Sequence, residues 1–404
     1  MADNKDKKVL NVPALRFPEF SGEWKKLRLS DFATKITKKN KGNIVKNVLC
    51  NSANLGLVPQ VNYFDREIAN TENTDGYYVI CNGDFVYNPR KSTAAPFGPV
   101  NIYEGEEAGI ISPLYLCFSV HNIFPKFLYY RFKSSAWHSY VYSHGDSGVR
   151  FDRVSIKDDV FFDMPVYKPA QDEQIKIATI LQLIDERIAT QNKIIEDLKK
   201  LKSAIVEMLF CIQGGVLLRL GDIGSFVRGL TYSNEDITED VNATTVIRAN
   251  NLNYGNNVNK EDVVYVNKKP AEIQILRKGD IVICMSNGSS SLVGKNSYYS
   301  FDDRHSTIGA FCGVYRTSQQ LVKWLMQSQR YKRLVYQSLQ GGNGAIANLN
   351  GDDILNMTFR VVEHEKNVSI LSALGLTENS IAVNENLQEL YSAQKVYLLR
   401  HLFI

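Results

Sequence analysis

The sequence lacks the long apolar segments of a membrane protein. No run of 18 or more apolar residues occurs among its 404 residues, so we expect no helix that spans a bilayer. The charged start MADNKDKK is not followed by an apolar segment, and we therefore expect no secretory signal peptide. The six cysteines form no C-x-x-C pair, which argues against a zinc ribbon or a disulfide framework. We predict a cytoplasmic protein that does not associate with a membrane.

Catalytic and cofactor motifs are also missing. No P-loop motif is present, and the glycine-rich text GNGA at 342–345 follows an expected helix instead of opening one. The six histidines form no H-x-x-x-H pair of the kind that binds zinc. The text nearest to an amino-methyltransferase motif, Asn88-Pro89-Arg90-Lys91, lacks the second proline and the aromatic residue. We therefore expect no catalytic residue, no metal site and no cofactor in this chain.

The net charge is small, but the charged residues are unevenly distributed. The formal net charge is only +4, which by itself does not indicate a nucleic-acid partner. Between Lys25 and Lys46, however, seven lysines and one arginine stand against a single acid, Asp31. Such a basic segment is suited to contacts with phosphates. At 404 residues the chain is long enough for two or three domains, each with its own core.

The strongest pattern that is present lies at mid-chain, in residues 171–210. Apolar residues recur there with spacings of three and four, which is typical of a helix that packs along a coiled-coil seam. A helix of about 40 residues is a rod about 60 Å long. It cannot bury its apolar stripe alone, so we expect it to pack against another helix.

The rest of the first half mixes short strands with helices. Segments rich in β-formers lie at 77–80, 85–87 and 114–120, separated by Gly, Asn and Pro. Residues 125–143 have a helical pattern, and FFDMPVY (161–167) is typical of a short strand. We also expect a helix to begin at Ser30-Asp31.

The second half repeats the order of the first. LRLSDFA (27–33) recurs as LRLGDIG (218–224), and NGDFVYN (82–88) recurs as KGDIVIC (278–284). GDSGVR (145–150) aligns with GGNGAI (341–346), and a second periodic segment at 364–404 matches the mid-chain helix. Matches that keep their order at a nearly constant offset indicate an internal duplication of one globular domain plus one long helix.

The duplication predicts that the two long helices pair antiparallel, with a globular domain near each end. The polar seam positions Gln191 and Asn384 align, and a buried amide there would fix the register; exposure of both is the alternative. The residues expected to pair the helices are Ile177, Leu181, Ile184, Ile188, Gln191, Ile195, Leu198, Ile381, Asn384 and Leu387.

This arrangement resembles the DNA-specificity subunit of type I restriction–modification enzymes. The resemblance rests on WKKLRLSDFATKI, NGDFVYNPRKSTAAPFGPV, GIISPLYLCFSV and, above all, the mid-chain helix with its E-Q-x-x-I start. The terminal helix departs from the pattern, because it reads EHEKNVSIL where the first helix has the E-Q text.

The resemblance implies an α+β fold with two repeated α/β target recognition domains separated by two long antiparallel coiled-coil helices. We expect recognition domains at 1–168 and 212–363, and helices at 169–211 and 364–404. Each domain would read one half of a bipartite site on double-stranded DNA. The helices would set the spacer and dock two modification subunits, which two restriction subunits would join. S-adenosylmethionine, ATP and Mg would be bound by those partners.

Residues that could contact DNA are Lys and Arg for phosphates, with forked and amide side chains for base edges. In the first domain they are Lys35, Lys38, Lys39, Lys41, Asn88, Arg90, Lys91, Ser92, Thr93, Tyr142, His144 and Arg150. In the second they are Arg248, Asn250, Asn251, Asn287, Ser289, Ser290, Lys295, Arg304 and Asn343. A solvated loop or core packing is the alternative for each of them.

Two other functions remain open from the sequence. A duplicated coiled-coil adaptor that binds proteins and no DNA would share the helix pattern, but it would have no continuous basic groove. A degenerate specificity subunit that still folds but no longer assembles with its partner subunits would have all of these sequence motifs.

Overall fold

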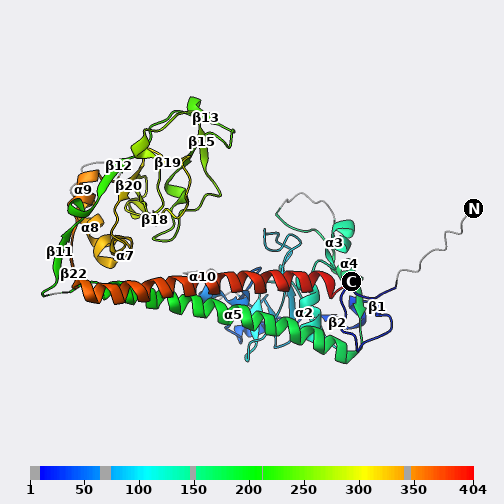
Figure 1. Ribbon diagram of the computed structural model, residues 1–404. Coiled ribbons are helices and arrows are strands. Elements are labelled where there is room, and N and C mark those ends of the chain that lie inside the picture. Colours follow the sequence, from blue (N-terminus) through cyan, green and yellow to red (C-terminus); the bar gives the residue numbers. More distant parts are fainter. Residues whose placement is uncertain (1–9, 64–73, 146–151, 212, 341–346) are drawn as a thin grey trace, which may run out of the picture. The chain divides into compact units, whose positions relative to one another are not determined.

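The computed structural model describes residues 10–63, 74–145, 152–211, 213–340 and 347–404. It divides into two compact units, one formed by Met1–Gln191 with Asn386–Ile404 and the other by Asn192–Glu385. The chain passes from one unit to the other within two long helices, α5 (Gln171–Glu207) and α10 (His364–His401) (Figure 1). Each unit therefore contains part of both helices. Among the described residues, no helix is long and apolar enough to cross a membrane.

The first unit is built on a four-stranded antiparallel sheet. Its strands, in order across the sheet, are β2 (Ala33–Lys35), β9 (Leu116–Val120), β6 (Phe85–Tyr87) and β7 (Val100–Ile102). Three antiparallel pairs accompany it: β1 (Lys25–Arg28) with β10 (Pro165–Lys168), β3 (Leu49–Ser52) with β4 (Gly56–Pro59), and β5 (Tyr78–Ile80) with β8 (Gly109–Ile111). The helices are α1 (Gln60–Tyr63), α2 (Pro125–Lys133), α3 (His138–His144) and α4 (Asp158–Phe162).

The second unit repeats this topology. Its main sheet has the order β12 (Ser225–Arg228), β20 (Cys312–Arg316), β16 (Ile281–Cys284) and β18 (Asn296–Tyr298), and β11 (Val216–Arg219) pairs with β22 (Thr358–Val361). A second sheet has the order β13 (Ile237–Thr238), β15 (Val264–Val266), β14 (Thr244–Ile247) and β19 (Ser306–Ile308), and β17 (Ser286–Asn287) pairs with β21 (Ala347–Asn348). The helices are α6 (Leu220–Ile223), α7 (Leu321–Leu325), α8 (Gln329–Gln340) and α9 (Gly351–Leu355). The shared strand order confirms the duplication.

The same turn precedes the central strand in both units. Gly83 and Gly279 adopt positive φ angles of 91° and 102°, a conformation that favours glycine. The aspartates that follow them, Asp84 and Asp280, accept hydrogen bonds from the backbone N–H three residues earlier at 2.7 and 2.8 Å. The G-D dipeptide repeated in the sequence thus marks a turn, and the buried strands β6 and β16 begin directly after it.

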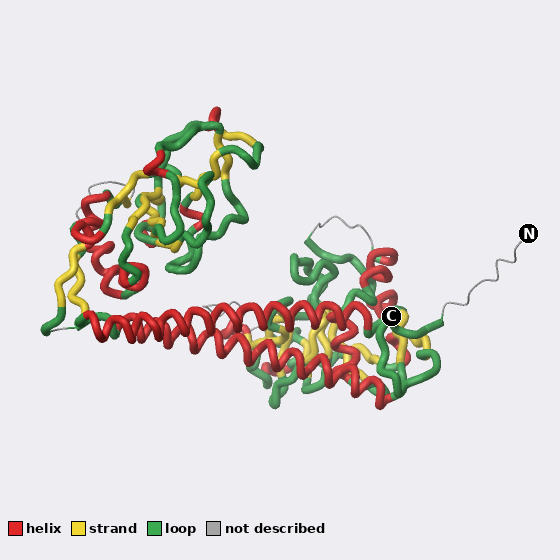
Figure 2. The backbone as a smooth tube through the Cα atoms, in the orientation of Figure 1, coloured by secondary structure: helices red, strands yellow, loops and turns green. Residues whose placement is uncertain are grey.

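The two long helices belong to the cores of both units. In the first unit, Ile177, Leu181 and Ile184 of α5 share one buried cluster with Leu398 of α10 and the sheet residue Phe118. In the second unit, Val206 of α5 and Leu374 of α10 are buried with the residues of β16 and α7. Figure 2 shows strands and loops of the first unit lying against its helical segments. The helices are therefore not a separate rod to which the domains are merely tethered.

Within each unit, α5 and α10 pack antiparallel, as predicted. Lys395 pairs with Asp185 at 2.5 Å in the first unit, and Lys199 pairs with Glu385 at 2.7 Å in the second. Of the residues expected at the seam, those that are buried are Ile177, Leu181, Ile184, Gln191, Ile195 and Ile381. Those that are half-buried are Ile188, Leu198 and Asn384. Leu387 is 36% exposed and is the most exposed of the set.

The E-Q dipeptide at the start of α5 holds the N-terminal arm. The buried Glu173 carboxylate accepts two hydrogen bonds from Arg16 at 2.8 Å and one from the indole N–H of Trp24 at 3.2 Å. Gln174 accepts from the backbone N–H of Phe124 at 2.9 Å and donates to the carbonyl of Pro169 at 2.9 Å. The dipeptide therefore acts as a structural clamp, in which the negative charge of Glu173 is balanced by Arg16.

The second helix has half of this clamp. Asn367 occupies the position of Gln174 and donates to the carbonyl of Val362 at 2.8 Å. Its Oδ1 atom is buried and has no hydrogen-bond partner among the described residues, because an asparagine side chain is one methylene shorter. Lys366 stands where the first helix has Glu173. The departure noticed in the sequence is thus a loss of contacts at the helix start.

One local prediction was wrong, and another needs refinement. No α-helix begins at Ser30-Asp31; a single 3-10 turn, Leu29–Asp31, joins β1 to β2. Asp31 accepts a hydrogen bond from the backbone N–H of Arg28 at 2.7 Å, as a helix-capping residue does. The helix that it caps is only one turn long. Residues 125–143 form two helices instead of one, because the chain leaves the helical path at Ser134.

Candidate nucleic-acid interface

The loop that follows β6 is held in one shape by its own backbone. Asn88 accepts a hydrogen bond from the backbone N–H of Arg90 at 3.0 Å, and Ser92 and Ala95 bond to each other through their backbones at 3.0 and 3.1 Å. Gly98 has a φ of 85°, and an added Cβ would lie 2.1 Å from the carbonyl oxygen of Asn88. Asn88, predicted to contact DNA, therefore shapes the loop.

The same loop pairs with the segment 152–154. The backbone N–H of Lys91 donates to the carbonyl of Asp152 at 2.8 Å, and that of Val154 donates to Pro89 at 2.8 Å. Arg90 and Arg153 are directly opposed in this short ladder. Their Nε atoms each lie 4.0 Å from Oδ2 of Asp152. The exposed side chains of Arg90, Lys91 and Thr93 thus extend from a fixed base.

Arg153 was missed in the sequence. Arg150, which was named instead, lies outside the described residues. The Nε atom of Arg153 is buried without a hydrogen-bond partner among the described residues. The sequence does contain a feature that points to Arg153. This arginine lies beside an acid in the segment RFDRV (150–154), directly after the Gly-bearing loop. Only strand pairing places it opposite Arg90.

The lysines expected to neutralise phosphates differ in how free they are. Lys35 pairs with Asp158 at 2.5 Å, and this hydrogen bond raises the pKa of its ammonium. It is therefore the least suited of the four to bind a phosphate. Lys38, Lys39 and Lys41 are exposed on the segment that leads into β3.

The aromatic candidates on α3 are placed at the surface. Tyr142 is 81% exposed. The His144 ring stacks on Tyr140 with centroids 4.0 Å apart, and its Nδ1 atom lies 2.9 Å from the hydroxyl of Ser143. Tyr142 is thus free to contact a ligand, whereas His144 is partly engaged in its own helix.

In the second unit, the corresponding loop after β16 forms the same turn, but its residues carry no charged side chains. Asn287 accepts from the backbone N–H of Ser289 at 3.0 Å, as Asn88 does in the first unit. Ser289 and Ser290 are exposed, and β17 pairs with β21 where the first unit pairs residues 90 and 153. The side chains available to a ligand are hydroxyls and amides.

Asp262 organises a second group of candidates. Arg248 lies 3.5 Å from its carboxylate, and Asn250 donates to it at 2.7 Å. Asn251 is 2% exposed; it accepts from the backbone N–H of Arg248 and donates to the carbonyl of Asp262, both at 2.8 Å. The prediction that Asn251 contacts DNA is therefore wrong, because its amide is used up in closing a turn.

The remaining candidates of the second unit are scattered. Lys295 lies over the ring of Tyr254, 5.0 Å from its centroid. Arg304 is exposed in the loop before β19, and Asn343 lies outside the described residues. The described residues contain no group of three or more His, Cys, Asp or Glu side chains that could hold a metal ion.

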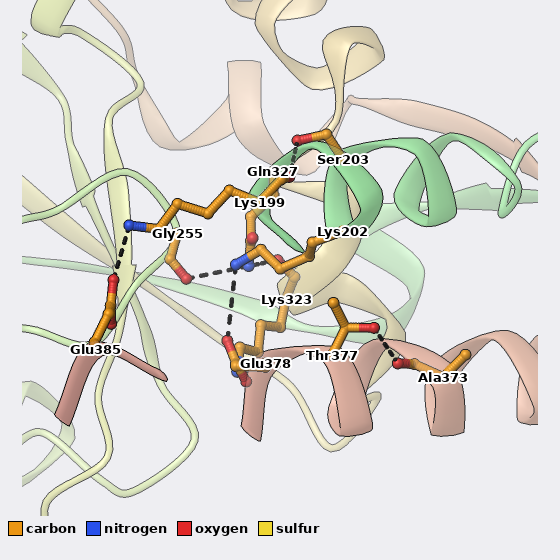
Figure 3. A network of polar contacts seen from close by, with 10 residues as sticks. All are labelled: Lys199, Lys202, Ser203, Gly255, Lys323, Gln327, Ala373, Thr377, Glu378 and Glu385. Carbon is orange, nitrogen blue, oxygen red and sulfur yellow. Dashed lines mark hydrogen bonds and ion pairs between the residues drawn. The ribbon is translucent and has the colours of Figure 1, made fainter. Parts of the chain in front are cut away.

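A cavity of about 830 Å³ lies in the second unit, lined in part by Ser290 and Lys295. Figure 3 shows the ion pairs on its α5 and α10 side, where Glu378 accepts from Lys323 at 2.5 Å and lies 4.0 Å from Lys202. Burial lowers the pKa of Lys202, and the neighbouring Glu378 opposes this shift. Lys202 and Lys323 share Glu378, and Lys199 pairs with Glu385, so these ion pairs connect α7 and α5 to α10.

Comparison with known proteins places the chain beside one family. Residues 21–200 match the family model for the type I restriction modification DNA specificity domain. The chain is 32% identical over 141 residues to the specificity subunit of the type I restriction enzyme EcoKI from Escherichia coli (strain K12), which covers 34% of this chain and 30% of that subunit. It is 35% identical over 107 residues to the StySPI specificity subunit from Salmonella potsdam, and this alignment covers 26% of this chain and 23% of that subunit. The alignments thus span less than a third of either relative.

Two solved structures share the fold along almost the whole chain. One is the S subunit of a type I restriction-modification system from M. genitalium, with a TM-score of 0.57, 15% identity and coverage of 97% of this chain and 99% of that one. The other comes from work on the assembly and conformational transition of a type I R-M system, with a TM-score of 0.57, 12% identity and coverage of 93% and 96%. The α+β fold predicted from the sequence is confirmed, and the predicted resemblance is confirmed for residues 21–200.

Proposed function

We propose that this chain, whose residues 21–200 match a type I restriction modification DNA specificity domain, gives such an enzyme its DNA sequence specificity. The observation that supports this most is the repeat itself. Two units with the same strand order each present a turn-anchored polar loop after the central strand. Two similar surfaces on one chain are suited to two half-sites on one duplex.

The two surfaces differ in chemistry, so the half-sites differ in sequence. The loop of domain 1 (1–168) carries Arg90 and Lys91, whereas that of domain 2 (212–363) carries Ser289 and Ser290. Charged forks and hydroxyls satisfy different base edges. The chain therefore recognises an asymmetric, bipartite site.

The helical segments 169–211 and 364–404 set the unread spacer and dock the methyltransferase subunits. Both helices carry exposed apolar residues, at roughly heptad spacing along α10, that the seam does not cover. They are Ile175, Leu183, Ile194 and Leu201 on α5, and Val368, Leu376, Val383, Leu390 and Tyr397 on α10. A covering partner would bury such a surface.

Catalysis resides in the partners of this cytoplasmic, non-catalytic subunit. Two modification subunits would supply S-adenosylmethionine-dependent methylation of DNA, and two restriction subunits would supply ATP- and Mg-dependent translocation and cleavage. The sequence of this chain contains neither the methyltransferase motif nor the P-loop that these reactions require.

The test is DNA binding by the chain in complex with its modification subunit. Binding to one duplex sequence should exceed binding to others by at least about 10³-fold. The logarithm of the affinity should fall with the logarithm of salt concentration, with a slope of about −0.9 for each neutralised phosphate. An affinity that ignores both sequence and salt would contradict the proposal and favour a protein adaptor.

A further inference from the structure

The cluster formed by Arg90, Asp152 and Arg153 in the first unit has the chemistry of a base-pair reader. Resting on the proposed function, we propose that Arg90 and Asp152 read a G·C pair in the major groove, and that Arg153 is a positioning residue for them. Guanine presents two acceptors, O6 and N7, to a forked guanidinium, and cytosine presents its N4 amine to a carboxylate. The cluster offers both groups side by side.

The backbone fixes the positions of these side chains. Arg90 and Arg153 are opposed across a two-stranded ladder, and Lys91 N–H bonds to the carbonyl of Asp152 at 2.8 Å. The Asn88 turn and the steric fit at Gly98 hold the other end of the loop. A loop with such a base pays little for backbone ordering when it binds a ligand.

The three groups do not form a structural ion pair. In this chain, structural Arg–carboxylate pairs are close and have a buried acid: Arg16 bonds to Glu173 at 2.8 Å and Arg316 to Asp280 at 2.7 and 2.8 Å, with carboxylates that are 1% and 2% exposed. In the Asp152 cluster, both Nε atoms lie at 4.0 Å, and the Arg90 and Asp152 side chains are 69% and 55% exposed. These ion pairs are long, and the exposed side chains of Arg90 and Asp152 can still form hydrogen bonds with a ligand.

A base edge fits this cluster better than a phosphate. A carboxylate placed between two guanidiniums repels the phosphate backbone, whereas it is the group that accepts a hydrogen bond from cytosine N4. Arg153 carries the second positive charge, so the trio keeps a net charge of +1 and is attracted to DNA despite Asp152. The corresponding pair in the second unit, β17 with β21, has the uncharged residues Ser286, Asn287, Ala347 and Asn348, so this reader belongs to the first unit.

The test selects preferred duplexes from a random DNA library with the full chain bound to its modification subunit. The wild-type complex should select at least one G·C pair in one half-site. Arg90→Ala should reduce the preference at that position by about 5- to 100-fold. Arg90→Gln should shift it toward A·T, because glutamine pairs with adenine N6 and N7. Arg187→Ala, which removes an exposed arginine of α5, is the control and should leave the motif unchanged.

Arg153 has a separate readout. Arg153→Ala should reduce the preference for the G·C pair, because Arg90 and Asp152 are no longer held in place, and Arg153→Lys, which restores the charge, should recover part of that preference. Asp152→Asn should relax discrimination at the cytosine while tightening non-specific binding. A bipartite motif that Arg90→Ala and Arg90→Gln leave unchanged, in variants with the wild-type melting temperature, would overturn this inference alone. Selection of no motif by the wild-type complex would overturn the proposed function as well.

Discussion

At the residue scale, a half-buried lysine makes the stability of the chain depend on pH. Lys133 donates to Oδ1 of Asn101 at 2.6 Å, and burial, with Lys395 nearby, lowers its pKa to about 8. The folded state therefore binds fewer protons than the unfolded state between pH 8 and 10.5, the ordinary pKa of a lysine. Because stability rises with pH wherever the unfolded state binds more protons, folding should gain stability across that window.

The measurement compares wild type with Lys133→Met in urea unfolding from pH 7 to pH 10. The variant has no ammonium at this site, so the stability of the wild type relative to it should rise by on the order of 2 kcal/mol. A difference that stays constant with pH would show that Lys133 titrates as an exposed lysine does.

The clamp at the start of α5 gives a second residue-scale prediction. Glu173→Gln would leave the Arg16 guanidinium, whose side chain is 14% exposed, without its counter-charge. We expect a loss of about 2 kcal/mol or more in the free energy of unfolding. Asn367→Gln should instead gain about 1 kcal/mol, because the longer amide can pair the buried oxygen. If both substitutions changed stability equally, the two helix starts would not differ as described.

Side-chain roles were the least predictable part of the site. Asn88, Asn251 and Asn287 were selected because amides read base edges, but each uses its amide to hold a turn. Residue type cannot distinguish these uses, because both need the same donors and acceptors. Arg153 was missed because its importance comes from an opposing strand.

At the element scale, the loop after β6 depends on one glycine. Gly98→Ala would place a Cβ 2.1 Å from a backbone oxygen, whereas Gly83→Ala has a similar φ but open space around it. Gly83→Ala should cost about 1 kcal/mol of stability. Gly98→Ala should cost more and also reduce specific DNA binding by more than about 10-fold, because the loop must move. Equal binding by the two variants would contradict a fixed loop.

Elements were predictable where periodicity was long. The 3-4 pattern located α5 and α10 to within a few residues, and the duplicated text predicted the repeated sheet. Leu29–Asp31 shows where such prediction fails. A capping residue that is not followed by apolar residues at helical spacing supports only one turn of helix.

At the scale of the whole molecule, the helices should act as a spacer ruler. Inserting four residues, about 6 Å of helix, between Ile188 and Ile195 of α5 and at the matching level of α10 should lengthen the unread spacer or abolish recognition. Single-helix insertions should destabilise the chain, because they break the pairing. If the original spacer is still methylated at the full rate after the double insertion, the helices do not set it.

The central claim is that this chain gives a methyltransferase its sequence specificity. Single-molecule sequencing of methylated adenines, in cells with and without the chain, tests it most directly. We predict a bipartite motif with two different half-sites and an unread spacer of fixed length, which disappears when the chain is removed. An unchanged set of methylated adenines in cells without the chain would contradict the account.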